Sequence, residues 1–156
     1  MSEEKILSEM ETFFMALADK TRLRLLNLMR QDEICVCFFT EVLGESQPKI
    51  SRHLAYLRNA GMVEARREGK WMHYSISEPK DENAEKVLQE VLAWLANQDE
   101  MRKDHEKYQQ VCCSPEMLVQ IARTPMEFIL PKADMLESDV KENFSPAHNE
   151  LEEFML

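Results

Sequence analysis

Apolar and polar residues recur with helical spacing through the N-terminal part of the chain. Between residues 5 and 18, apolar side chains follow the roughly 3.6-residue repeat that puts them on one face of an α-helix. The same repeat predicts a second, short helix over residues 21–29 and a third over residues 34–43. Gly44 follows directly, and a glycine at this place commonly ends a helix. Three amphipathic helices are therefore expected to pack together at the start of the chain.

A fourth helix is expected between Ser46 and Gly61. Ser46 is suited to cap its start, and Pro48 is tolerated in its first turn. Its buried stripe follows the i, i+4, i+7 pattern and comprises Ile50, Leu54 and Leu57. Because successive residues turn by about 100°, a polar, basic and donor-rich face lies opposite that stripe. The short turn of residues 44–46 sets this helix against the preceding one, as a helix-turn-helix requires.

Two short strands follow, over residues 62–67 and 71–76, and a glycine-containing turn joins them into a hairpin. A long helix is expected from residue 83 to about residue 110. Beyond it, prolines and scattered acidic residues predict a partly ordered tail. The fold class is therefore mainly α with a small β-hairpin (α+β), a winged helix-turn-helix. Residues 1–110 form its domain, and residues 111–156 form a C-terminal extension.

Positive charge is concentrated around the fourth helix and the hairpin. The formal net charge of the chain is −10, which by itself argues against a nucleic-acid binder. Residues 20–77, however, hold ten Lys and Arg against six Asp and Glu, and affinity for DNA follows the local patch. Guanidinium, amide and hydroxyl groups there suit base edges and phosphates. The side chains expected to contact double-stranded DNA are Gln47, Lys49, Ser51, Arg52, Tyr56, Arg66, Arg67 and Lys70.

Four cysteines form two close pairs, Cys35 with Cys37 and Cys112 with Cys113. The acidic N-terminus lacks the layout of a signal peptide, and no apolar run approaches the ~18 residues of a membrane span. A cytoplasmic protein without a membrane partner is expected, and structural disulfides are rare in that compartment. Neither pair has the C-x-x-C spacing of a zinc knuckle or a thioredoxin-like site. Close-set thiols then indicate soft-metal capture or thiol switching.

Three motifs, in this order, resemble the ArsR/SmtB family of metalloregulators, and in particular its arsenical-resistance operon repressors. They are EICVC at residues 33–37, SQPKISRHL at residues 46–54 and REGKWMHY at residues 67–74. The resemblance covers roughly residues 10–77. It implies a winged-helix homodimer whose first and last helices form the interface. It also implies that resistance genes are derepressed when a metal binds.

The resemblance further implies that Cys35 and Cys37 bind the inducer, As(III) or Sb(III), with no organic cofactor. In the arsenic-sensing branch, a third cysteine follows three residues later, but Thr40 stands at that position here. A hydroxyl is a hard and weak ligand for a soft ion. The third ligand is therefore left open.

The second cysteine pair lies just past the predicted last helix, where some arsenic-sensing relatives also carry adjacent cysteines. Cys112 and Cys113 could form a complete second site. They could instead donate a third thiolate to Cys35 and Cys37, within one chain or across the dimer. An incidental pair of thiols is the remaining alternative.

A helix over residues 34–43 would keep the first pair of thiols apart. Residues i and i+2 of a helix point about 200° apart, so Cys35 and Cys37 are not expected to face one ion. Our hypothesis is that an ion held by both sulfurs unwinds this turn and shifts the DNA-reading helix that follows. Binding of the ion would then release the operator.

Two alternatives keep the DNA-binding fold. The thiols could form a redox or sulfur-species switch, because acidified, exposed thiols oxidise readily. The chain could also sense zinc or cadmium, although its last helix offers only His105 as an imidazole ligand. An enzyme such as a thiol-dependent arsenate reductase needs a phosphate-cradling loop after its cysteine. Phe38 and Phe39 occupy that place and glycine is scarce, so catalysis is not expected.

Overall fold

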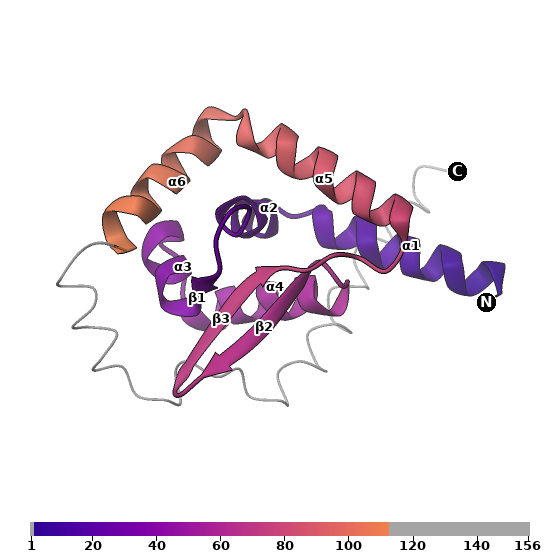
Figure 1. Ribbon diagram of the computed structural model, residues 1–156, viewed down its shortest axis with the longest axis horizontal. Helices are drawn as coiled ribbons and strands as arrows, with labels where there is room; N and C mark the ends of the chain where they lie inside the picture. Colours follow the sequence, from indigo (N-terminus) through magenta and orange to yellow (C-terminus); the bar gives the residue numbers. More distant parts are fainter. Residues whose placement is uncertain (1, 113–156) are drawn as a thin grey trace, which may run out of the picture.

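The computed structural model describes residues 2–112, and within this range six helices pack together with a small sheet at one side of them (Figure 1). In chain order the elements are α1 (Glu3–Leu17), α2 (Lys20–Leu28), β1 (Ile34–Cys35), α3 (Val36–Leu43), α4 (Gln47–Asn59), β2 (Val63–Glu68), β3 (Trp71–Ile76), α5 (Glu82–Ala96) and α6 (Asp99–Cys112). Of the predicted extension, only residues 111 and 112 belong to the described range, and Cys113 lies outside it. None of the helices over residues 2–112 is both long and apolar enough to cross a membrane.

The turn between α3 and α4 has the predicted geometry. Gly44 ends α3 with a left-handed φ of 66°, which glycine adopts at little cost. Ser46 caps α4 by accepting a hydrogen bond from the Lys49 backbone N–H at 3.4 Å. The predicted stripe of α4 is fully buried and comprises Ile50, Leu54 and Leu57. The helix-turn-helix is thus confirmed, with α4 resting its apolar side on the core.

The predicted hairpin forms, but it pairs with a further strand that the pattern did not predict. The sheet is antiparallel with the order β1-β3-β2. The expectation of a helix starting at Ile34 is wrong, because Ile34 and Cys35 pair with Tyr74 and His73 of β3. Ile34 is buried and β-branched, which suits a strand, and the pairing satisfies backbone groups that would otherwise be buried without partners. The helix starts only at Val36.

The single long helix predicted over residues 83–110 is also wrong, because the chain breaks at Asn97 and Gln98 into α5 and α6. Asparagine is a poor helix former and is suited to a helix end. Apolar periodicity continues on both sides of the break, so the pattern alone did not reveal it. After the break, α6 turns back over α2 and α3 and buries Met101 and Asp104 (Figure 1).

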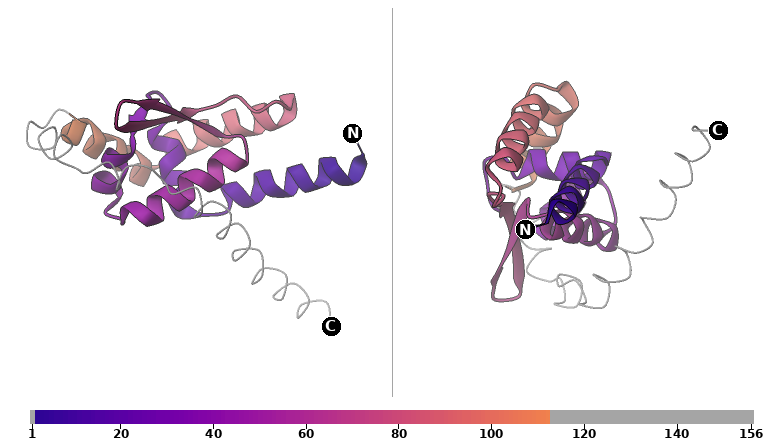
Figure 2. Two further views of the ribbon diagram at one scale, coloured as in Figure 1. Left: turned by 90° about the horizontal axis from the view of Figure 1, so that it is seen from below. Right: turned by 90° about the vertical axis from the view of Figure 1, so that its right-hand side faces the viewer.

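The helix α2 lies at the centre of the arrangement, where it contacts α1, α4, α5 and α6. Its side chains Leu25, Leu26 and Leu28 are at most 1% exposed. Further views show that the N-terminal part of α1 extends away from the rest of the described chain, as does the hairpin tip (Figure 2). The core thus supports two projecting elements, one helical and one β.

A charged pair fastens α6 to α2. The Nε and Nη2 atoms of Arg24 donate to the two carboxylate oxygens of Asp104 at 2.7 and 2.8 Å. Such a two-pronged contact is stronger than a single hydrogen bond. Next to it, Asn27 Nδ2 donates to the backbone oxygen of Met101 at 3.0 Å. The position of α6 over the core therefore depends on polar contacts as well as on apolar packing.

We expect Asp104→Ala to lower the free energy of unfolding by about 2 kcal/mol, between the values for exposed and fully buried ion pairs. The reason is that Arg24, with 26% of its side chain exposed, loses a partner that is 8% exposed. Arg102→Ala on the same helix is the matched control, since its pair with Asp99 is largely exposed. It should cost less than about 0.5 kcal/mol. Urea denaturation measures both, and equal losses would contradict the role of Asp104.

Candidate nucleic-acid interface and thiol site

The polar side of α4 is accessible along its N-terminal half. Arg52 is exposed, while Gln47, Lys49 and Ser51 are half-buried. The Nζ atom of Lys49 lies 2.9 Å from Glu45 Oε1, one turn earlier. Exposed pairs of this kind contribute little, so the lysine can exchange the carboxylate for another anion. The structure thus brings four of the predicted DNA-contacting side chains together on one helix.

Tyr56 does not belong to that outer face, contrary to the prediction. Its side chain is 9% exposed, and the guanidinium carbon of Arg22 lies 4.2 Å from the centre of its ring. This is a cation–π contact, which is stronger where water is excluded. Tyr56 lies at the edge of the buried stripe, and a long side chain there can turn towards the core. Its role is structural, because it packs α4 against α2.

Arg22 was not predicted as a functional residue, yet it joins the end of α1 to α4. Its Nε donates to the Ala16 backbone oxygen at 2.8 Å, and its Nη2 donates to that of Met15 at 2.9 Å. Its Nη1 lies 3.3 Å from Nδ1 of His53 on α4. Burial lowers the pKa of Arg22, but a guanidinium stays charged in proteins. The sequence does not distinguish Arg22 from the other basic residue in the middle of the same helix, Arg24.

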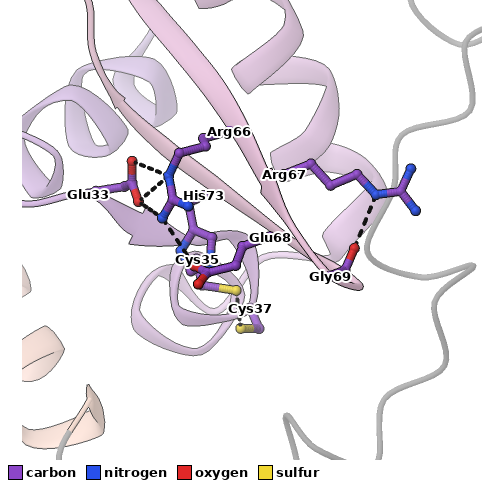
Figure 3. A network of polar contacts seen from close by, with 8 residues as sticks. All are labelled: Glu33, Cys35, Cys37, Arg66, Arg67, Glu68, Gly69 and His73. Carbon is purple, nitrogen blue, oxygen red and sulfur yellow. Dashed lines mark hydrogen bonds and ion pairs between the residues drawn. The ribbon is translucent and has the colours of Figure 1, made fainter.

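In the middle of the hairpin, Arg66 is held between two carboxylates (Figure 3). Its Nε donates to Glu33 Oε1 at 3.1 Å, and its Nη2 donates to Glu68 Oε2 at 3.2 Å. These hydrogen bonds, the one to Glu33 first, raise the pKa of Arg66. A DNA phosphate would have to displace a carboxylate to reach this side chain. Arg66 is therefore a weaker candidate for DNA contact than its position suggested.

The hairpin tip carries the other two predicted cations. Arg67 donates Nε–H to the backbone oxygen of Gly69 at 3.1 Å (Figure 3). The Nζ atom of Lys70 lies 4.8 Å from the centre of the Trp71 ring. The partner of Arg67 is an uncharged carbonyl, so this contact orients the arginine without neutralising its charge.

The first two thiols face each other at the junction of β1 with α3. Cys35 is the N-cap of α3, with an extended backbone at φ −69° and ψ 140°. Cys37 lies in the first helical turn, and its thiol points at Cys35 Sγ over 3.0 Å (Figure 3). The expectation that the two side chains point apart is wrong, because Cys35 is not helical. Both sulfurs can reach one ion without unwinding of α3.

The hydrogen bond between the two thiols shifts their pKa values in opposite directions. The contact with Cys37 is the main reason that the pKa of Cys35 falls from 9.0 to about 7. The same contact, together with burial, raises the pKa of Cys37. When the pair loses one proton, the negative charge is therefore on Cys35 and the remaining proton is on Cys37. A thiolate is the form that attacks electrophiles and binds metals.

Within residues 2–112, no third sulfur ligand lies next to this pair. The same range contains no group of three or more His, Cys, Asp or Glu side chains placed to hold a metal ion. The hydroxyl of Thr40 donates to the Cys37 backbone oxygen at 2.8 Å. Cys112, at the end of α6, directs its thiol to the backbone oxygen of Gln109 at 3.4 Å. Cys113 lies outside the described residues. Of the three predicted sulfur ligands within residues 2–112, the structure brings Cys35 and Cys37 together.

Residues 19–65 match the family model described as bacterial regulatory protein, arsR family. The chain is 43% identical over 90 residues to an arsenical resistance operon repressor of Escherichia coli, covering 57% of this chain and 75% of that protein. It is 44% identical over 92 residues to an arsenic resistance transcriptional regulator of Pseudomonas putida, covering 58% and 70%. Both relatives are regulators by name.

Among solved structures, the chain resembles a homodimeric winged helix-turn-helix DNA-binding domain from Mycobacterium bovis, described as a possible ArsR-family transcriptional regulator. The TM-score is 0.51 at 30% sequence identity, and the match covers 62% of this chain and 88% of that one. The winged helix-turn-helix predicted from the pattern of apolar residues is thereby confirmed.

We expect His53 to make the folded protein sensitive to acid. Burial is the main reason that the pKa of His53 falls below 6.5, although Asp19 opposes this, and the nearby cations Arg22, Lys49 and Arg52 lower it further. The unfolded chain then binds a proton more readily, so stability is present above pH 6.5 and decreases as the pH falls below it. In His53→Asn, which keeps a hydrogen-bond acceptor for Arg22, this part of the decrease should disappear. Urea denaturation over a series of pH values measures it, and an unchanged pH profile would refute the assignment.

Proposed function

The chain belongs to the arsR family of bacterial regulatory proteins, and we propose that it is a cytoplasmic, dimeric transcriptional repressor that senses a trivalent metalloid. In this proposal it binds operator DNA and releases it when Cys35 and Cys37 bind arsenite or antimonite. The observation that carries the proposal is the pair of thiols 3.0 Å apart, one on each side of the first residue of α3. The names of the two arsenic-resistance relatives support the choice of ion.

The chemistry of the pair suits a trivalent metalloid. Arsenite at neutral pH is As(OH)₃, and each thiol that binds replaces one hydroxyl and releases one water. The thiolate of Cys35 makes the first As–S bond, and the leaving hydroxide takes up a proton from the solvent to become water. Cys37 makes the second bond and gives its own proton to the second leaving hydroxide. Soft thiolates bind soft ions, and two sulfurs held close together need little rearrangement to chelate one. The third position on arsenic is filled by a remaining hydroxyl or by another ligand.

The DNA-reading elements of the proposal are α4 and the hairpin. Gln47, Lys49, Ser51 and Arg52 have the side chains that base edges and phosphates recognise, and α4 leaves them accessible. Arg67 and Lys70 at the hairpin tip are suited to the DNA backbone, to which arginine and lysine contribute affinity without sequence preference. Tyr56 is left out of this set because it is buried.

A second copy of the chain is proposed to cover the apolar side of α1 and α5. Four large apolar side chains of α1 are between 44% and 65% exposed, namely Ile6, Leu7, Met10 and Phe14. On α5, Trp94 is 73% exposed and lines a shallow groove together with Val87 and Val91. Contiguous apolar surface of this kind typically marks an interface. The homodimeric state named for the Mycobacterium bovis domain supports the same choice of partner.

The thiol site is linked to both DNA-reading elements. The helix α3 carries the thiols at its start and leads into α4 through the turn at Gly44. The strand β1 carries Cys35 and pairs with β3 of the hairpin. An ion bound at this junction can therefore favour a state in which α4 and the hairpin no longer fit the operator together. Coupling of this kind typically amounts to about 1–3 kcal/mol.

A second candidate function is a thiol redox switch, which the 3.0 Å sulfur separation also favours. An oxidant such as a peroxide would convert Cys35 to a sulfenic acid. Cys37 would then displace water from it to form a disulfide. Operator release by peroxide, reversed by a dithiol reductant, together with indifference to arsenite, would favour this candidate over metalloid sensing.

We expect Arg67→Ala to weaken DNA binding more than Arg66→Ala, although the two residues are adjacent. Arg67 keeps its positive charge available at the hairpin tip, whereas Arg66 is balanced by Glu33 and Glu68. Loss of one phosphate contact should reduce the slope of log K against log salt concentration by about 1 for Arg67→Ala. Fluorescence anisotropy with a duplex from the promoter of its own gene measures these slopes. A larger effect of Arg66→Ala would contradict the assignment.

We expect arsenite to release the wild-type protein from that duplex, and to have no effect on Cys35→Ser or Cys37→Ser. Each substitution removes one of the two As–S bonds on which chelation depends. The control is the double variant Cys112→Ser, Cys113→Ser, which should still respond. Gel-shift titrations with arsenite and antimonite under full reduction make the measurement. If only the control variant lost its response, the sensor would lie at the end of α6 instead.

A further inference from the structure

A row of three residues crosses the sheet beside the thiol pair. Cys35 of β1 lies opposite His73 of β3, and His73 lies opposite Arg66 of β2. Directly opposed residues of antiparallel strands point to the same face, with Cβ atoms about 4.5–5.5 Å apart. The imidazole of His73 therefore shares a face of the sheet with the sulfur of Cys35, as Figure 3 shows.

On this face a carboxylate lies next to one ring nitrogen of His73. Its Nε2 lies 3.5 Å from Glu68 Oε2, a separation at which a carboxylate orients the ring but does not lock it. Glu68 is in turn held by Arg66 at 3.2 Å. Histidines that bind metals through one nitrogen usually donate the other N–H to a carboxylate. Glu68 thus occupies the place of the carboxylate that such a histidine contacts through its second nitrogen. Nδ1 would then be the nitrogen that binds the ion.

We propose that His73 is the third ligand of the thiol site, and that Cys35, Cys37 and His73 bind a divalent thiophilic cation of the class of Cd²⁺ or Zn²⁺. The inference rests on the thiol site of the proposed function and widens the range of ions that the site accepts. Two thiolates and an imidazole are a donor set typical of such borderline ions, whereas a trivalent metalloid favours a further sulfur. The three side chains are not yet gathered around one point, so the ion must draw the ring and the sulfurs together.

The other candidates for the third position are less suited to it. The Thr40 hydroxyl is a hard donor, and it is engaged with the Cys37 backbone oxygen. The Cys112 thiol is directed to a backbone oxygen of its own helix, α6. Only His73 belongs to an element that pairs directly with the strand carrying Cys35. An ion held by these ligands connects α3 to β3, and the hairpin tip with Arg67 moves with β3.

The test is a cadmium titration of the full-length, reduced protein, followed by the thiolate-to-cadmium charge-transfer absorption in the ultraviolet. His73→Gln should lower the affinity for Cd²⁺ by at least about tenfold, the loss typical even of an outer partner. His73→Cys, which puts a thiolate in the same place, should restore affinity to the wild-type value or above it. Cys112→Ser is the matched control and should bind as the wild type does. Thermal unfolding of each variant, measured without metal, verifies that the fold is kept.

Wild-type affinity in His73→Gln would overturn the proposal, and so would an equal loss in Cys112→Ser or a failure of His73→Cys to restore binding. These results are separable from the fate of the proposed function. A protein that stayed on its promoter in arsenite would refute metalloid sensing, whatever the cadmium titration gave. A protein that released DNA in arsenite while His73→Gln bound cadmium normally would refute this inference alone.

Discussion

The two-residue pairing of β1 with β3 decides where α3 begins, and the geometry of the thiols depends on that start. Because Ile34 and Cys35 are bonded to β3, the chain turns from strand to helix between Cys35 and Val36. Cys35 therefore keeps an extended backbone, and its sulfur lies 3.0 Å from that of Cys37. A helix that began at Ile34 would have turned the same side chains about 200° apart. The short distance between the sulfurs therefore depends on the junction of β1 with α3 rather than on the helix itself.

This geometry changes how an ion could act on the DNA-reading surface. Both sulfurs are available without unwinding α3, so the free energy of binding need not be used to break helical hydrogen bonds. It is instead available to move the junction relative to β3. The rest of α4 is held differently, because Arg22 contacts His53 and Tyr56 on its inner side while bonding to the end of α1. The reading helix is thus held from two directions, by α3 at its start and by Arg22 along its inner side.

Local signals were enough to predict much of the fold. Gly44, Ser46 and the stripe from Ile50 to Leu57 act through backbone conformation, capping and helical repeat, all of which are readable within a few residues. The errors arose where distant segments decide. Ile34 and Cys35 continue an apolar pattern that a helix fits equally well, and only their partners on β3 make them a strand. Tyr56 was assigned to the outer face because the arginine that covers it lies in α2.

The same limit applies to the ligands of the thiol site. A search along the chain looks for a third cysteine near the first two, finds Thr40, and then looks to the next cysteines at the end of α6. His73 becomes a candidate only when the register of β1 on β3 is known. If all three ligands came from one helix, ion binding would depend mainly on the conformation of that helix. The proposed set, drawn from a strand, the following helix and the hairpin, would make ion binding depend on how these elements are arranged, and the proposed operator binding would depend on the same arrangement.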